Sequence, residues 1–213
     1  VELTLMRSGE QKVARDYEII VVNDGSTDRT VEVVKELQRL DHKIRLTSHA
    51  KNKGYGAAVK TGLKAATMDW IFFTDSDGQF HYDELDKFVA ASQSADLVIG
   101  YRRKRMDPFH RVFVAQVLLK IWNFFLFGLT VRDVDCAYKL FKREVRDSIK
   151  LETESAITVT ELLVKAKSLG YRITQLPVTH YARKFGEQTG GNWRVIAKAA
   201  NESFKLRRKI RHV

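Results

Sequence analysis

Short apolar runs typical of strands alternate with helically spaced segments through the first hundred residues, and this alternation limits the fold more than any other feature. Each of the first three runs leads into a polar loop that contains glycine, and a helical pattern follows. Strand, loop and helix in succession are the repeating unit of α/β proteins. The sequence therefore predicts an open, mostly parallel, twisted sheet flanked by helices. The predicted strands lie at 17–22, 44–47, 71–74 and 96–100, and the predicted helices at 31–40, 57–66 and 83–91.

The strand predicted at 71–74 runs directly into two acids, Asp75 and Asp77. Side chains two residues apart in an extended segment point to the same side, so these carboxylates can converge on one cation. Mg²⁺ and Mn²⁺ prefer oxygen ligands and often share them with substrate phosphates. The alternative is a polar turn that ends the strand, since Asp, Ser and Gly are ordinary turn residues. Asp75 and Asp77 are thus a candidate metal site.

Polar loops also follow the first two predicted strands. Asp24 comes after the first of them, and Asn52–Gly56 after the second. In open α/β sheets, ligands bind beyond the carboxyl ends of the strands, where these loops and the two acids are predicted to lie. Gly54 and Gly56 either let backbone amides approach a phosphate or only form a tight turn. Their spacing matches neither a Walker loop nor the dinucleotide-binding fingerprint.

The composition is typical of a globular domain, with 44% hydrophobic and 30% charged residues among 213. The formal net charge of +11 indicates an anionic partner, which can be a nucleic acid, an acidic lipid surface or a phosphorylated substrate. The one cysteine, Cys136, excludes an internal disulfide and a cysteine-based zinc cluster and suits a reducing environment. No uncharged apolar run reaches the ~20 residues that cross a bilayer.

A strongly apolar helix is predicted after Pro108, where the alternation ends. Its aromatic and aliphatic residues extend around most of the circumference, which indicates burial, an interface or contact with lipid. The basic cluster Arg102–Arg105 precedes it and would match anionic headgroups. The alternative is a core helix that follows a solvated basic loop. The run 171–178 is predicted to be an edge strand because it contains Pro177, and a basic amphipathic helix is predicted from Trp193 onward.

Five motifs occur in order along these predicted elements. Together they resemble the family 2 glycosyltransferases of the GT-A fold, and they are similar above all to the polyprenyl-phosphate or dolichyl-phosphate mannosyl- and glucosyltransferases. The resemblance extends from Glu18 to about Asn201. The motifs are VVNDGSTD at 21–28, NKGYGAA at 52–58, DSDGQ at 75–79, DVDCAYK at 133–139 and RKFG at 183–186.

The resemblance implies that the first two motifs bind the donor nucleotide. Asp24 matches the acid that hydrogen-bonds the base, and a carboxylate can accept such a bond from an imide N–H. Gly25, Ser26 and Gly54 would belong to the same nucleotide-binding site, together with Asp75.

The other motifs are implied to carry the metal and the acceptor. Asp75 and Asp77 match the motif that holds Mg²⁺ or Mn²⁺ on the diphosphate of a nucleotide sugar. Asp133 matches the first acid of the acceptor-side motif and is the candidate base. A lipid phosphate needs orientation more than deprotonation, because its second pKa is near ~6. Arg183 matches a basic residue near the phosphates, where its fork of donors suits their oxygens.

The sequence departs from the family pattern in several places, one of which is Gln188–Thr189, where the family commonly carries Ser or Lys. Asp135 and Ala137 stand where many relatives carry Ser or Thr and Gly, which leaves the acceptor open. The family's first strand is expected before Val1 and is not represented in the sequence. On this basis we expect a GT-A glycosyltransferase domain at 1–190 and a basic helix at 191–213.

The leading hypothesis is a metal-dependent inverting glycosyltransferase that moves a hexose from a nucleotide diphosphate sugar to a polyprenyl (dolichyl-type) phosphate. The expected location is cytoplasmic, peripheral at the inner face of a membrane or beside a membrane partner. One alternative acceptor is a saccharide hydroxyl, for which Asp133 would have to act as a true base. An alternative of another class is a non-catalytic module that binds nucleotides or nucleic acid, although nucleic acid is the less expected partner.

Overall fold

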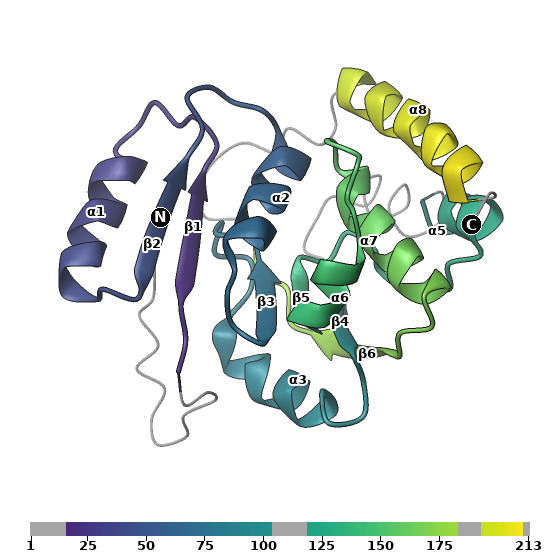
Figure 1. Ribbon diagram of the computed structural model, residues 1–213, viewed down its shortest axis with the longest axis horizontal. Helices are drawn as coiled ribbons and strands as arrows, with labels where there is room; N and C mark the ends of the chain where they lie inside the picture. Colours follow the sequence, from purple (N-terminus) through teal and green to yellow (C-terminus); the bar gives the residue numbers. More distant parts are fainter. Residues whose placement is uncertain (1–15, 104–118, 183–192, 211–213) are drawn as a thin grey trace.

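The computed structural model describes residues 16–103, 119–182 and 193–210, in which strands and helices alternate along the chain (Figure 1). The strands are β1 (Ile19–Asn23), β2 (Ile44–Ser48), β3 (Trp70–Thr74), β4 (Leu97–Arg102), β5 (Tyr138–Lys142) and β6 (Ile173–Val178). The helices are α1 (Thr30–Leu40), α2 (Tyr55–Ala65), the 3₁₀ turn η1 (Tyr82–Glu84), α3 (Leu85–Ala91), α5 (Leu119–Phe127), α6 (Arg143–Ser148), α7 (Ile157–Ser168) and α8 (Trp193–Ile210).

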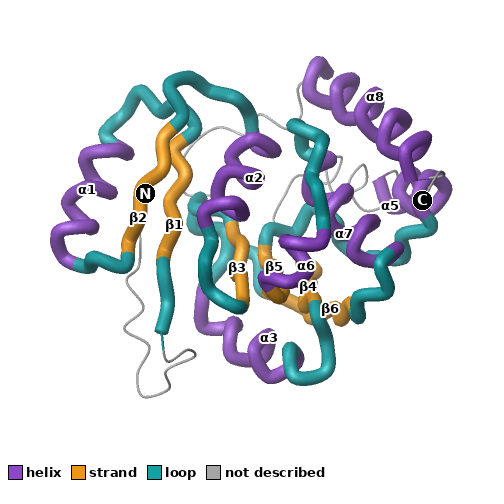
Figure 2. Tube along the Cα trace, viewed as in Figure 1, coloured by secondary structure: helices purple, strands orange, loops and turns teal. Residues whose placement is uncertain are grey.

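The described strands form two sheets (Figure 2). β1 and β2 pair in parallel, and the second sheet has the order β3-β5-β4-β6. In this larger sheet β4 and β6 are parallel, whereas β5 runs antiparallel to both β3 and β4. The carboxyl ends of β3 and β4 therefore meet the amino end of β5 at one end of the sheet.

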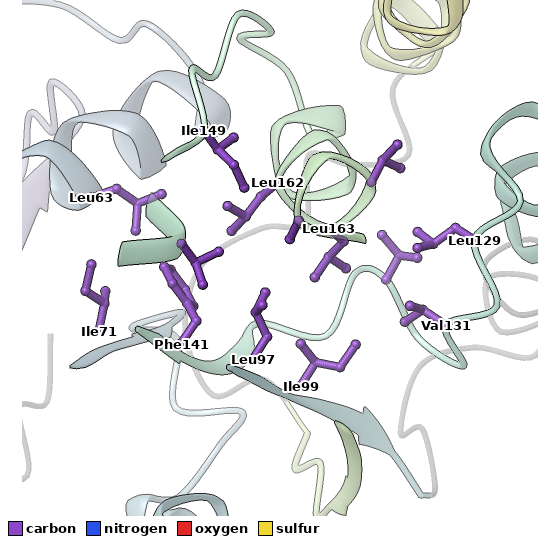
Figure 3. Packing of buried hydrophobic residues seen from close by; sticks show 14 of the residues in the cluster. Leu63, Ile71, Leu97, Ile99, Leu129, Val131, Phe141, Ile149, Leu162 and Leu163 are labelled. Carbon is purple, nitrogen blue, oxygen red and sulfur yellow. The ribbon is translucent and has the colours of Figure 1, made fainter. Parts of the chain in front are cut away.

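The larger sheet separates two hydrophobic clusters, because alternate side chains of a strand point to opposite faces. Leu97 of β4 enters one cluster with Leu63 of α2 and Leu162 of α7 (Figure 3). Val98, the next residue of β4, enters the other cluster with Phe88 of α3. Helices thus pack against both faces of the sheet, and the strand ends remain available for polar loops.

The predicted α/β class and the open sheet flanked by helices are confirmed. The sheet is mixed, however, because β5 is antiparallel to both of its neighbours. The prediction of an edge strand with Pro177 is also confirmed, since β6 lies at the end of the strand order and pairs with β4.

The apolar helix predicted after Pro108 is described from Leu119 onward as α5, and its beginning lies outside the described residues. Asn123 of α5 is buried, whereas Phe124 and Phe125 are exposed. Among the helices that the structure describes, none combines the length and the apolar character needed to cross a bilayer.

Candidate active site

The two acidic motifs meet at one end of the larger sheet. Thr74, the last residue of β3, pairs with Tyr138, the first residue of β5. The chain therefore leaves β3 through Asp75 and enters β5 from 133–137 at the same end. β4 also ends here, at Arg102, because it is antiparallel to β5. The fold thus brings together the predicted donor and acceptor motifs, although about 60 residues separate them in sequence.

Asp75 and Asp77 belong to a tight turn after β3. Asp77 Oδ1 accepts a hydrogen bond of 3.1 Å from the Gln79 amide, and Gly78 turns the chain with a φ of 73°. Only glycine adopts such a φ without strain. Two carboxylates supply oxygen donors of the kind that Mg²⁺ and Mn²⁺ prefer, so the donor chemistry fits the predicted cation. Within the described ranges, no three His, Cys, Asp or Glu side chains converge as a metal site.

Asp133 is held by Arg102 in a bidentate ion pair. Arg102 Nε lies 2.7 Å from Asp133 Oδ2 and the second guanidinium nitrogen lies 2.8 Å from Oδ1, and each side chain is 10% exposed. The Arg102 amide also donates to Oδ2 at 3.3 Å. With both oxygens engaged, Asp133 is positioned firmly.

This pairing changes the interpretation of the basic cluster Arg102–Arg105. Arg102 faces Asp133 and is not available to anionic headgroups, and only Arg103 of the remaining cluster is described. The contact joins residues 31 positions apart, so no local sequence signal could have shown it.

Lys139 lies on β5, and its side chain is almost fully buried beside the acids. Its Nζ donates to the carbonyl oxygen of Val134 at 3.0 Å and to that of Cys136. Burial lowers the pKa of Lys139, and nearby acidic groups that include Asp133, Asp135 and Asp75 oppose this change. Lys139 therefore fixes the turn before β5. Sequence reasoning included it in the motif 133–139 but gave it no role, although a lysine in an apolar strand was a usable signal.

Asp135 lies in the turn that Lys139 fixes, and it remains exposed to solvent. Desolvation of its carboxylate and the nearby charge of Asp133 raise the pKa of Asp135, whereas the charges of Arg102 and Lys139 lower it. Cys136, the next residue, is buried, and burial raises the pKa of its thiol to about 12. Cys136 is therefore a packing residue and not a nucleophile.

Asp24 organises the predicted nucleotide loops at the carboxyl end of β1. Its carboxylate accepts hydrogen bonds from the amides of Lys53 at 2.9 Å and Gly54 at 2.8 Å, and His49 Nδ1 lies 2.6 Å from Oδ1. Burial would raise the pKa of Asp24, but the hydrogen bonds from His49 and the two amides lower it. The carboxylate is thus ionised and holds the glycine loop in place. Its contact with a base stays a prediction.

Gly25 and Ser26 continue the loop after β1. Gly25 has a φ of 73°, and a Cβ atom there would lie 2.6 Å from the amide nitrogen of Asn52, so only glycine fits. The Ser26 amide donates to Asn23 Oδ1 at 2.9 Å. The loops that follow β1 and β2 therefore pack directly on each other. His49, in the loop after β2, contacts Asp24 and also Thr61 of α2, whose Oγ1 lies 2.8 Å from Nε2. The sequence did not single out His49.

Arg183 lies outside the described residues, as do Lys104 and Arg105 of the basic cluster. The role of Arg183 therefore stays a prediction.

The sequence profile described as glycosyl transferase family 2 matches residues 8–149. The chain is 27% identical over 188 residues to undecaprenyl-phosphate 4-deoxy-4-formamido-L-arabinose transferase of Aeromonas hydrophila, with 87% of this chain and 56% of the relative covered. It is 30% identical over 193 residues to dolichyl-phosphate beta-glucosyltransferase ALG5A of Trichomonas vaginalis, with 83% and 58% covered. The chain thus spans a little more than half the length of these relatives.

Among solved structures, the fold is similar to that of glucosyl-3-phosphoglycerate synthase from Mycobacterium tuberculosis in complex with phosphoglyceric acid. The TM-score is 0.62 at 21% identity, with 86% of this chain and 68% of that chain covered. A second structure of that enzyme, with Mn²⁺, UDP-glucose and phosphoglyceric acid, gives a TM-score of 0.61 at 20% identity, with the same shares covered. At this level of identity the likeness shows the fold, and it confirms the predicted GT-A architecture.

Proposed function

Since the chain belongs to glycosyl transferase family 2, we propose that it transfers a hexose from a nucleotide diphosphate sugar to a polyprenyl phosphate. The observation that carries this proposal is the meeting of the two acidic motifs at one end of the larger sheet. The names of the two relatives support the acceptor class, because both refer to the phosphate of a polyprenyl lipid.

The donor would bind across the loops after β1, β2 and β3. Asp24, Gly25, Ser26 and Gly54 would form the nucleotide side. Asp75 and Asp77 would hold Mg²⁺ or Mn²⁺, which when bound stabilises negative charge on the diphosphate. Mn²⁺ beside UDP-glucose in a structural neighbour supports this choice of ion.

The acceptor would approach from the turn before β5. A phosphate oxygen of the acceptor attacks the anomeric carbon, the bond from this carbon to the diphosphate breaks, and the nucleoside diphosphate leaves with the electron pair. This displacement inverts the anomeric configuration. A phosphate monoester is largely a dianion near neutral pH and needs no base. Asp133, held by Arg102, would therefore orient the acceptor side, and Arg183 would bind phosphate oxygens.

A saccharide hydroxyl is the second candidate acceptor, and one observation favours it. Asp135 is exposed in the turn before β5, and its pKa is raised by desolvation of the carboxylate and by the charge of Asp133. A carboxylate with a raised pKa is a better proton acceptor than an ordinary one, and a hydroxyl must lose its proton during transfer. Activity towards short saccharides that depends on Asp135 would favour this acceptor.

The membrane contact that a lipid acceptor requires would be made by α5 and α8. Phe124 and Phe125 of α5 and Phe204 of α8 are exposed, and Trp122 packs on Phe204 at a centroid distance of 5.1 Å. Exposed Lys120 and Arg208 lie one helical turn from Phe124 and Phe204, respectively, on the same faces. Aromatic groups flanked by cations suit an anionic bilayer surface on the cytoplasmic side.

A thermal-shift screen tests the donor and the metal together. UDP-glucose and GDP-mannose would be added with Mn²⁺, with Mg²⁺ and with a chelator, because a specific ligand stabilises the folded protein by mass action. We expect one nucleotide sugar to raise Tm only with metal, and Asp75→Asn or Asp77→Asn to abolish this shift. Binding that ignores the chelator and survives both substitutions would contradict the proposal and favour a non-catalytic module.

Liposome co-sedimentation tests the membrane surface. The double variant Phe124→Gln, Phe125→Gln should bind liposomes that contain phosphatidylglycerol less than the wild type does. Leu40→Gln is the matched control, because Leu40 is an exposed apolar residue on the distant helix α1. Equal binding of all three proteins would overturn the assignment of this surface.

A further inference from the structure

Tyr55, the first residue of α2, stands between two glycines that are both fixed in place. On its amino side, the Gly54 amide donates to Asp24 Oδ2 at 2.8 Å, and Gly54 has a φ of 93°. On its other side, Gly56 packs so closely against the start of α7 that a Cβ atom would lie 2.3 Å from Thr158 Oγ1. The backbone on either side of Tyr55 therefore has a defined position, which fixes the direction of its side chain.

That direction is towards the end of β3. The ring of Tyr55 packs edge-on against Phe73, with 6.4 Å between ring centroids and 63° between ring planes. Phe73 is the second-last residue of β3, and Asp75 is the first residue after the strand. Tyr55 therefore lies beside the end of β3 that leads into Asp75, and it stays 41% exposed.

We propose that Tyr55 contacts the transferred hexose, with its hydroxyl directed between the donor motif at Asp75 and the acceptor motif at Asp135. This inference rests on the proposed function. In a displacement of that kind the sugar lies between the diphosphate and the acceptor, and these belong to the two motifs. The glycine loop 52–56 then has a role that differs from both sequence-based alternatives, because it places a tyrosine and does not only bind phosphate or form a turn.

The charges around Tyr55 support this placement. Desolvation raises the pKa of Tyr55, and so do the nearby carboxylates of Asp75 and Asp135, one from each motif. The charge of Arg102 lowers it. A tyrosine hydroxyl has an ordinary pKa of about 10, so it is protonated at neutral pH and can donate a hydrogen bond to a sugar oxygen. The ring also offers an apolar edge to the C–H groups of the sugar.

The variant Tyr55→Phe removes the hydroxyl and keeps the ring on Phe73. Isothermal titration would compare UDP-glucose with UDP, both with Mn²⁺, or GDP-mannose with GDP if that pair binds the wild type. We expect the nucleotide sugar to bind about tenfold more weakly, since one hydrogen bond is lost, and the nucleoside diphosphate to bind as in the wild type. Tyr17→Phe is the matched control, because Tyr17 is 46% exposed and its hydroxyl donates to Asp41 Oδ2 at 2.9 Å. Tyr17 lies at the amino end of β1, whereas the candidate site lies at the carboxyl ends of the strands.

Two results would overturn the assignment of Tyr55. Unchanged affinity of Tyr55→Phe for the nucleotide sugar would show that the hydroxyl does not contact the hexose. An equal loss for the nucleoside diphosphate would place the contact on the nucleotide. If the wild-type protein binds neither nucleotide sugar, the proposed function itself fails, and this outcome is distinct from both of the others.

Discussion

Arg102 and Asp133 are the pair on which the acceptor side of the candidate site depends. Each side chain is 10% exposed, so the charges are mostly removed from water and compensate each other. Removing one partner of such a pair leaves an uncompensated charge. We expect Arg102→Gln to lower the free energy of unfolding by about 3 kcal/mol, measured by urea denaturation.

Two further variants make this prediction specific. Arg102→Lys keeps the charge but loses the bidentate fork, so we expect an intermediate loss of stability. Arg29→Gln is the control, because its pair with Glu32 is largely exposed and should add nothing measurable. Equal stability of Arg102→Gln and the wild type would mean that the pair does not hold the turn before β5.

Asp96 is a second residue that joins distant strands. It accepts hydrogen bonds from Arg172 Nε at 3.2 Å and Lys142 Nζ at 2.7 Å, and these contacts lower its pKa well below the usual value. The resulting stabilisation is complete above the unfolded pKa of about 4 and is lost as the pH falls below it. We expect Asp96→Asn to cost about 2 kcal/mol near pH 7.

The pH dependence of this cost separates charge from shape. Urea denaturation at pH 7, 5 and 3 should show the difference between wild type and Asp96→Asn shrinking towards the acid end, because the wild-type carboxylate takes up a proton there on unfolding. A difference that stays constant over this range would contradict an ionic origin.

Among the secondary-structure elements, periodicity predicted β1 to β4 and the helices α1, α2 and α3 because it is a local property of the sequence. The direction of β5 was not predictable in this way, since an antiparallel strand and a parallel one share the same alternation. The same limit applies to the site. The position of Asp75 and Asp77 was predictable because they directly follow a strand in the sequence. The pairing of Asp133 with Arg102 was not, because it forms only when β4 and β5 come together.

Helix α2 packs tightly against the start of α7 at Gly56. A Cβ atom on Gly56 would lie 2.3 Å from Thr158 Oγ1 and 2.5 Å from both the Glu154 carbonyl carbon and the Ser155 oxygen. We expect Gly56→Ala to destabilise the protein by about 2 kcal/mol through overpacking, measured as a loss in urea midpoint. Gly62→Ala, in the same helix, meets only a methyl group of Val22 at 3.2 Å and should change stability less.

A second substitution tests the cause. Two of the three obstructing atoms at Gly56 are backbone atoms, so adding Thr158→Ala should not restore the stability of Gly56→Ala. Full rescue by Thr158→Ala would show that the Thr158 side chain alone obstructs the added methyl group, and it would contradict an obstruction by the backbone.

At the scale of the whole molecule, contacts lead from the last helix to the candidate site. Glu202 of α8 accepts hydrogen bonds from the Ser155 amide at 3.2 Å and from Ser155 Oγ at 2.7 Å. The backbone at Glu154 and Ser155 in turn packs on Gly56, next to Tyr55. The same segment has a second anchor in buried Glu161 of α7, whose Oε2 accepts from the Thr153 amide at 2.9 Å. Docking of α8 therefore supports the loop that places Tyr55.

Hydrogen exchange measures this support directly. Glu202→Ala removes the acceptor of the Ser155 amide, so we expect this amide to exchange about tenfold faster. We also expect faster exchange at 54–60, because the start of α7 then presses less firmly on Gly56, while β2 keeps its wild-type exchange as an internal reference. Lys198→Ala, an exposed residue of α8, is the control. Faster exchange confined to α8 itself would show that the helix packs on the domain without restraining the loop beside the site.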